Sequence, residues 1–132
     1  MLATFFQPQI KKINFEIVQH ALNNSEKYML INTLTFGEQY CLIKNTIFYQ
    51  DEERVINGLL NAYDYESKTF IIYGKNANDE TAEKKAKQIM GFGFQNVFLY
   101  SGGLFEWMLL QDIYGDSNFP TTKHVLDILK FK

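Results

Sequence analysis

The residues best placed for chemistry lie between positions 74 and 80, directly after the apolar run Phe70 to Tyr73. The segment reads Gly74-Lys75-Asn76-Ala77-Asn78-Asp79-Glu80 and leads into a helical pattern. A loop between a buried strand and a helix N-terminus offers backbone N–H groups and a helix dipole, which favour an anion. However, this loop contains no Cys, Ser, Thr, His or Arg. The most site-like stretch of the chain therefore lacks a nucleophile.

Two residues of the loop, Lys75 and Asp79, could still take part in chemistry. Lys75 could hold an anion over the loop, or it could simply be exposed to solvent. Asp79 could be a general base or a metal ligand, but an Asp at a helix start is better suited to capping the helix. A metal site built on Asp79 and Glu80 would need further ligands that the sequence does not place. We therefore predict a helix cap at Asp79, no metal and no cofactor.

Cys41 is the only cysteine, so an intrachain disulfide is excluded. It lies between Tyr40 and Leu42, and a free Cys in such surroundings is usually a small buried apolar side chain. The alternative is that Cys41 carries sulfur in place of a loop cysteine. His20 and His124 have no Cys, Asp or Ser partner at a catalytic spacing, so we predict structural or solvated roles for both.

Apolar runs alternate with helical patterns along the chain, which predicts an α/β fold with a mainly parallel sheet and helices on both faces. The predicted strands are residues 28–33, 46–49, 70–73 and 96–100, with a further short apolar stretch at 41–43. The predicted helices are residues 15–23 capped by Asn14, one that opens at 51–53, 79–90, 104–114, and a last one capped by Thr122. In such sheets ligands bind beyond the carboxyl ends of the strands, where the loop after Tyr73 lies.

Length and charge limit the possible functions. A chain of 132 residues predicts one domain, and a net charge of -2 argues against nucleic-acid binding. No apolar run approaches the roughly 20 residues of a membrane span, and the N-terminal segment lacks a signal-peptide pattern. We therefore expect a cytoplasmic protein whose partners are other proteins.

We predict three regions along the chain. Residues 1–12 are expected to form an irregular lead-in, residues 13–112 the domain, and residues 113–132 an extension with a short helix packed on the domain. In this last helix, Val125, Ile128 and Leu129 are expected to face inward.

The predicted helix at 104–114 is apolar around more than one side. Trp107 is expected in the core, whereas Phe105 and Leu109 are expected to face a neighbour. Phe119 and Phe131 of the extension either cover part of that surface or extend it. These four phenylalanine and leucine residues are the predicted partner surface.

Two glycine-containing motifs follow the loop. Gly93-Phe94-Gln95-Asn96-Val97 precedes a strand, and Ser101-Gly102-Gly103-Leu104-Phe105-Glu106-Trp107 follows it. Together with the loop they resemble the C-terminal half of a rhodanese-like domain, with its GF-x-NV and GG-x-x-x-W segments. Residues 30–34 and 41–47 are similar to the earlier segments of that family, and the resemblance covers about residues 13–112.

The resemblance implies about five mainly parallel strands with flanking helices. In catalytic members a Cys opens the loop and carries sulfur as a persulfide, and related phosphatases add an Arg at the loop end. Here Gly74 or Lys75 stands at the Cys position, and Asp79 and Glu80 replace the Arg. Three further family positions have also lost their polar or charged group: Asn32, Leu34 and Leu42. Sulfur transfer at the loop requires the thiolate of the Cys, and cysteinyl phosphate chemistry also requires a cation at the transferring group.

The sequence thus predicts a catalytically inactive rhodanese-like protein that serves as an interaction or structural module, as one subunit of a larger assembly. One alternative is an enzyme, either a weak sulfurtransferase that uses Cys41 or an activity that uses Asp79 and Lys75. Another is a regulatory domain that binds a small anion at residues 74–80. Some centrosomal and ciliary proteins carry rhodanese-like domains with acidic, Cys-free loops, so the resemblance also implies a cytoskeletal or ciliary location.

Overall fold

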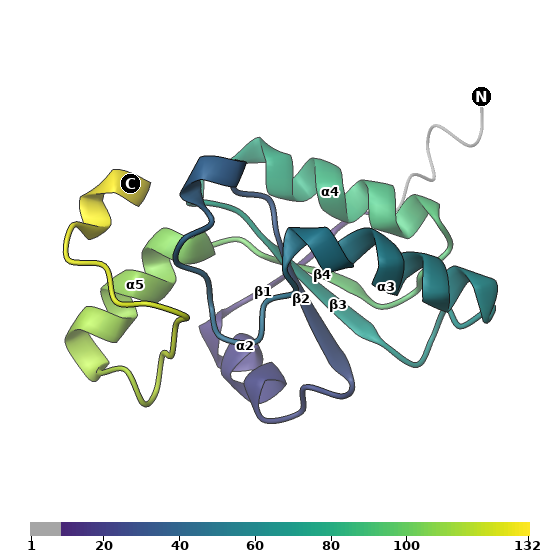
Figure 1. The fold of residues 1–132 in the computed structure, drawn as a ribbon, viewed down its shortest axis with the longest axis horizontal. Coiled ribbons are helices and arrows are strands. Elements are labelled where there is room, and N and C mark those ends of the chain that lie inside the picture. The colour runs from purple at the N-terminus through teal and green to yellow at the C-terminus, as the bar shows by residue number, and fades with distance from the viewer. Residues whose placement is uncertain (1–8) are drawn as a thin grey trace.

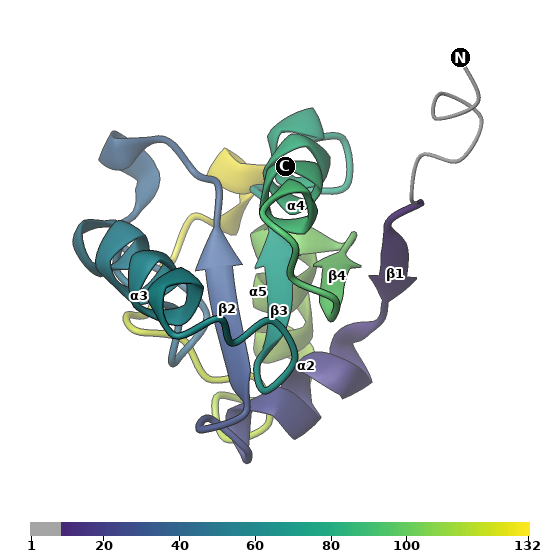
Figure 2. The ribbon, with the colours of Figure 1, turned by 90° about the vertical axis from the view of Figure 1, so that its right-hand side faces the viewer.

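A parallel sheet of four strands lies at the centre of residues 9–132, the part of the chain that the computed structural model describes. The strands are β1 (Lys11–Ile13), β2 (Tyr28–Asn32), β3 (Thr69–Tyr73) and β4 (Val97–Tyr100). Their order across the sheet is β1-β4-β3-β2, as Figure 2 shows. The predicted α/β class and parallel pairing are confirmed.

Helices cover both faces of this sheet (Figures 1 and 2). The helices are α2 (Phe15–Leu22), α3 (Tyr49–Asn61), α4 (Glu80–Gly91) and α5 (Gly103–Tyr114). One apolar core lies under α2 and α5, and the other under α3 and α4. None of the described helices is long and apolar enough to cross a membrane.

Strand β3 contributes to both cores because successive side chains of a strand point to opposite faces. Ile71 and Tyr73 pack in the core under α2 and α5, and Phe70 and Ile72 pack in the other. All five residues of β3 are buried, as a continuous apolar run predicts for a central parallel strand. This strand fixes the start of the loop at the carboxyl edge of the sheet.

The predicted helix starts at Asn14 and Asp79 are confirmed. The side-chain oxygen of Asn14 accepts hydrogen bonds from the backbone N–H groups of Glu16 and Ile17, at 3.0 and 3.3 Å. The buried face of α4 consists of Ala82, Ala86 and Ile89, and Met90 at the end of this face is partly buried.

The predicted strand at residues 46–49 is wrong. Of these four residues, only Thr46 forms a bridge, with Leu30, and Tyr49 already begins α3. Asn45 has a left-handed backbone with φ 69°, which interrupts an extended run. The Thr46 hydroxyl then hydrogen-bonds to the Ile43 carbonyl at 2.6 Å and lies 2.7 Å from the Tyr73 hydroxyl, so side chains hold this segment.

The N-terminal lead-in is wrong at residues 11 and 12, which belong to strand β1. Lys12 is paired with Leu99 and Ile13 with Tyr100 of β4. A three-residue strand with two exposed lysines has no apolar pattern to predict it, and lysine is a common residue of edge strands. Residues 1–8 of the predicted lead-in lie outside the described part of the chain.

The C-terminal extension contains a short 3-10 turn, Ile128–Phe131, instead of a helix that begins after Thr122. Thr122 instead pairs with the backbone of Leu42, through its N–H (2.8 Å) and its hydroxyl oxygen (3.0 Å). Val125 and Ile128 pack against the core as predicted, whereas Leu129 is 65% exposed. Phe131 is the residue of this turn that is buried.

Candidate functional site

The loop between β3 and α4 is held in place by the start of α5. The N–H groups of Leu104 and Phe105 donate to the carbonyl oxygens of Gly74 and Lys75, both at 2.9 Å. Gly103 permits this approach, because its φ is 71° and a β-carbon there would lie 2.9 Å from the Asn76 nitrogen. The second glycine of the GG-x-x-x-W segment therefore serves to fit α5 against the loop.

The carboxylate of Asp79 occupies the inner side of the loop. Its Oδ2 accepts the Lys75 N–H at 2.9 Å, and its Oδ1 accepts the N–H of Thr81 at 3.0 Å. The Thr81 hydroxyl also donates to Oδ1. These bonds combine the cap of α4 with a closure of the loop, and only the cap was predicted from the sequence.

Gly74 lies directly against this carboxylate. A β-carbon at position 74 would be 2.6 Å from Oδ2 of Asp79 and 2.9 Å from its carboxyl carbon. These separations are shorter than non-bonded contacts allow, so a side chain at position 74 and the Asp79 carboxylate compete for one space. At Gly74, one of the two positions that the resemblance assigned to a loop cysteine, this space is filled by an acidic side chain.

The hydrogen bonds at Asp79 also affect its ionisation. Burial of the carboxyl group acts to raise its pKa, but the bonds from Lys75 and Thr81 outweigh burial and hold the pKa of Asp79 below its ordinary value. Asp79 is therefore a carboxylate at neutral pH and is poorly suited to be a general base.

Lys75 is paired with a residue distant in sequence. Its Nζ lies 2.7 Å from Oε2 of Glu38, and both side chains are about one third exposed. The hydrogen bonds from Lys75 and Thr35 hold the pKa of Glu38 below its ordinary value. The Lys75 ammonium group, which the sequence analysis considered as a ligand for an anion, is thus paired with Glu38. No sequence pattern links residues 38 and 75, so the pair could not be predicted.

Asn76 connects the loop to the end of the chain. Its Oδ1 accepts the N–H of Asn78 at 3.0 Å, and its Nδ2 donates to the carbonyl oxygen of Phe131 at 3.1 Å. The C-terminal extension is thus part of the surroundings of the loop, a role that the sequence did not indicate.

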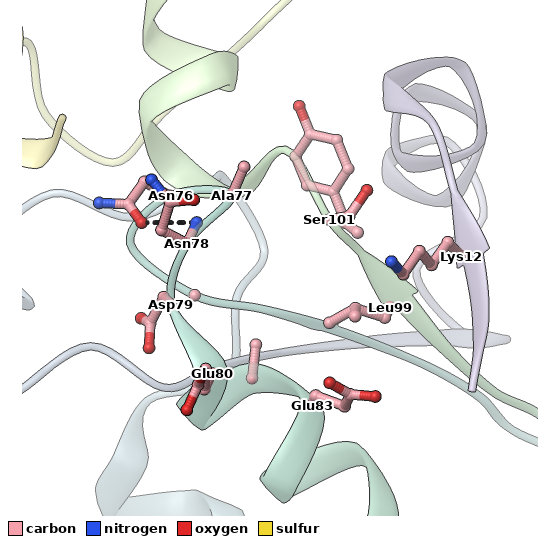
Figure 3. Close-up of a pocket in the computed structure, with 12 residues that line it drawn as sticks. Lys12, Asn76, Ala77, Asn78, Asp79, Glu80, Glu83, Leu99 and Ser101 are labelled. Carbon is pink, nitrogen blue, oxygen red and sulfur yellow. Dashed lines mark hydrogen bonds between the residues drawn. The ribbon is translucent and has the colours of Figure 1, made fainter. Parts of the chain in front are cut away.

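A hollow of about 280 Å³ lies between the loop and the neighbouring strands β1 and β4 (Figure 3). Lys12 enters it from β1 and Glu83 from α4, with Ser101 above Leu99 at the end of β4. None of the residues that line this hollow is a Cys, His or Arg. The Ser101 hydroxyl consequently has no imidazole within the hollow to activate it.

Cys41 does not lie in this hollow. Its side chain is fully buried, and its thiol donates to the carbonyl oxygen of Lys123 at 3.1 Å. Burial raises the pKa of the Cys41 thiol. Among residues 9–132 no group of three or more His, Cys, Asp or Glu side chains is arranged to hold a metal ion.

The predicted partner surface is only partly on the surface. Phe105 is half-buried and Leu109 is 37% exposed, but Phe119 and Phe131 are 3% and 1% exposed. Phe119 packs 5.0 Å from the Trp107 ring between centroids, and Phe131 joins the same core. Of the two alternatives for the extension, covering the domain is therefore correct, and Phe119 and Phe131 cannot face a partner.

Solved structures resemble this chain at low sequence identity. A yeast protein tyrosine phosphatase of the rhodanese family is 15% identical, with a TM-score of 0.65 over 92% of this chain and 97% of that protein. A protein from Lactobacillus plantarum is 19% identical, with a TM-score of 0.60 over 93% of both chains. An As-Sb reductase from Leishmania major is 18% identical, with a TM-score of 0.55 over 82% of this chain and 81% of that chain.

No protein-family model matches the sequence. No curated protein matches it either. At these identities the solved structures establish the fold alone, and the residues of the site must be judged by their own geometry.

Proposed function

We propose that this chain, which has the rhodanese fold, serves as a non-catalytic interaction or structural module within a larger protein assembly. The observation that carries the proposal is the Asp79 carboxylate, which fills the space in front of Gly74 and accepts the N–H groups of Lys75 in the loop and Thr81 in α4. The phosphatase and the reductase named above show that this fold hosts enzymes, so the distinction depends on the loop.

The contacts of the loop support a structural role. Gly74, Lys75 and Asn76 all bind other parts of the same chain: α5, Glu38 and the C-terminal turn. This part of the loop is a junction between elements, and the polar groups named here are engaged within the chain.

The outer side of α5 supports an interaction role. Leu109 and Ile113 are one helical turn apart and 37% and 68% exposed. Adjacent exposed apolar side chains on a helix suit contact with another protein. A cytoskeletal or ciliary setting stays a prediction from resemblance.

The enzyme alternatives have less support. Cys41 is buried with a raised pKa, which disfavours the thiolate that sulfur transfer requires. The anion-binding alternative needs a free Lys75 and open N–H groups, but Lys75 is paired with Glu38 and the Lys75 N–H donates to Asp79.

Three measurements test the proposal. Incubation with thiosulfate, followed by intact-mass analysis, should show no added sulfur, and p-nitrophenyl phosphate should not be hydrolysed. Gly74→Cys/Asp79→Ala provides an accessible loop thiol as the comparison for both assays. In extracts of the native source the chain should elute in an assembly well above its own mass. Turnover by the unaltered chain, or recovery only as a free monomer, would contradict the proposal.

A further inference from the structure

A second hollow, of about 380 Å³, lies between the starts of α2 and α5. Its apolar walls are the partly buried side chains of Ile13, Phe15 and Leu110. It shares Tyr100 and Ser101 with the hollow beside the loop. We refer to this second hollow as the α2–α5 groove. A mainly apolar groove with few polar groups accommodates the aliphatic part of a ligand.

One carboxylate lies in this groove. Glu106 is the only acidic or basic residue among those that line it. Its Oε1 accepts a hydrogen bond from the Tyr100 hydroxyl at 2.7 Å. Within the described chain, Oε2 has no hydrogen-bond partner. The groove therefore combines apolar walls with one carboxylate oxygen that is available to a ligand.

The position of this carboxylate depends on Gly102. A β-carbon at position 102 would lie 2.4 Å from the carboxyl carbon of Glu106, so a larger residue would displace the Glu106 side chain. Burial and the neighbouring Glu106 carboxylate raise the pKa of Tyr100 well above its ordinary value. Tyr100 thus stays a protonated donor at physiological pH, and it holds Glu106 in a fixed orientation.

Charge and shape together select the occupant. A lysine or arginine side chain joins an aliphatic stem to a cationic end, so its stem suits the apolar walls and its cation suits Glu106. The Glu106 carboxylate would repel an acidic side chain, and a purely apolar side chain would leave this carboxylate without a partner. We infer that the α2–α5 groove binds a lysine or arginine side chain of a partner protein. This inference rests on the proposed interaction function and assigns one contact of that assembly.

The test is a titration of the full chain, labelled with ¹⁵N, followed by NMR of the backbone amides. The probes are the peptides Ac-Gly-Lys-Gly-NH₂ and Ac-Gly-norleucine-Gly-NH₂, which differ in the cationic end of one side chain. The lysine peptide should shift the amides of Ser101, Gly102 and Glu106 and bind about tenfold more tightly than the norleucine peptide, equivalent to about 1.4 kcal/mol.

Two variants complete the test. Glu106→Gln keeps an oxygen that accepts from Tyr100 but removes the charge, so the two peptides should then bind equally. Glu53→Gln removes an exposed carboxylate on α3, which lines neither hollow, and should leave the tenfold preference unchanged. Equal affinity of the two peptides for the unaltered chain, or shifts away from the groove, would overturn the inference. The inference can fail while the sulfur and phosphate assays still support a non-catalytic function, so the two failures are distinguishable.

Discussion

Gly74 and Asp79 share one space: a β-carbon on Gly74 would lie 2.6 Å from Oδ2 of Asp79. In the present geometry the loop therefore accepts either a side chain at position 74 or the carboxylate of Asp79, but not both. A change at either position therefore alters the packing around the other.

This relationship predicts strong coupling between the two positions. Gly74→Ala should destabilise the chain by about 1–3 kcal/mol, because its methyl group overlaps the carboxylate. Asp79→Ala should cost about 1 kcal/mol through loss of the helix cap. The double variant Gly74→Ala/Asp79→Ala has no overlap. Its loss of unfolding free energy should therefore be smaller than the sum of the two single losses, by about 0.5 kcal/mol or more. Urea unfolding of the four proteins measures these terms, and simple additivity would refute the shared space.

The lowered pKa of Asp79 predicts a dependence of stability on pH. A carboxyl group whose pKa is lower in the folded state stabilises the fold above its unfolded pKa, about 3.9, and this contribution disappears as the pH falls through the folded pKa. The unaltered chain should therefore be more stable than Asp79→Asn at pH 6, and the difference should shrink below about pH 4.

Thermal unfolding of both proteins between pH 6 and the lowest pH at which they fold checks this expectation. Glu80→Gln is the control, because it removes an exposed carboxylate from the same helical turn. Its difference from the unaltered chain should vary less with pH. A difference for Asp79→Asn that stays constant or grows in acid would contradict the assigned hydrogen bonds.

The C-terminal turn is predicted to be part of the folded core. Phe131 is 1% exposed and its carbonyl oxygen accepts from Asn76, so Phe131→Ala should cost about 3–5 kcal/mol through lost burial and the cavity that remains. Leu129, two residues earlier, is 65% exposed, and Leu129→Ala should change stability by less than about 0.5 kcal/mol. Equal effects of the two substitutions in urea unfolding would show that the turn does not dock as described.

The sequence predicted the elements that carry strong local patterns. The apolar run at β3 and the caps at Asn14 and Asp79 are set by neighbouring residues, and all occur in the structure. β1 was not predicted, and the segment at Thr46 was wrongly predicted as a strand, because the positions of both depend on distant partners, β4 and the Tyr73 hydroxyl.

The site was predicted in composition but not in geometry. The absence of a nucleophile is visible in residues 74–80. The contact between Asp79 and Gly74 could not be predicted, because it depends on the path of the backbone that brings residue 79 next to residue 74. The Lys75–Glu38 ion pair and the Tyr100–Glu106 hydrogen bond also join side chains through tertiary packing, which periodicity does not encode.

Cys41 tests the remaining enzyme alternative through its reactivity. The thiol is fully buried, donates to the Lys123 carbonyl and has a raised pKa, so little reactive thiolate is available at neutral pH. We expect Cys41 in the folded chain to react with Ellman's reagent at least 100-fold more slowly than after unfolding in guanidinium chloride. Ser117→Cys, at an exposed position, is the matched control and should add one thiol that reacts rapidly in the folded state. A fast reaction of Cys41 in the unaltered, folded chain would mean that its thiol is accessible, and sulfur transfer through Cys41 would again be a competing function.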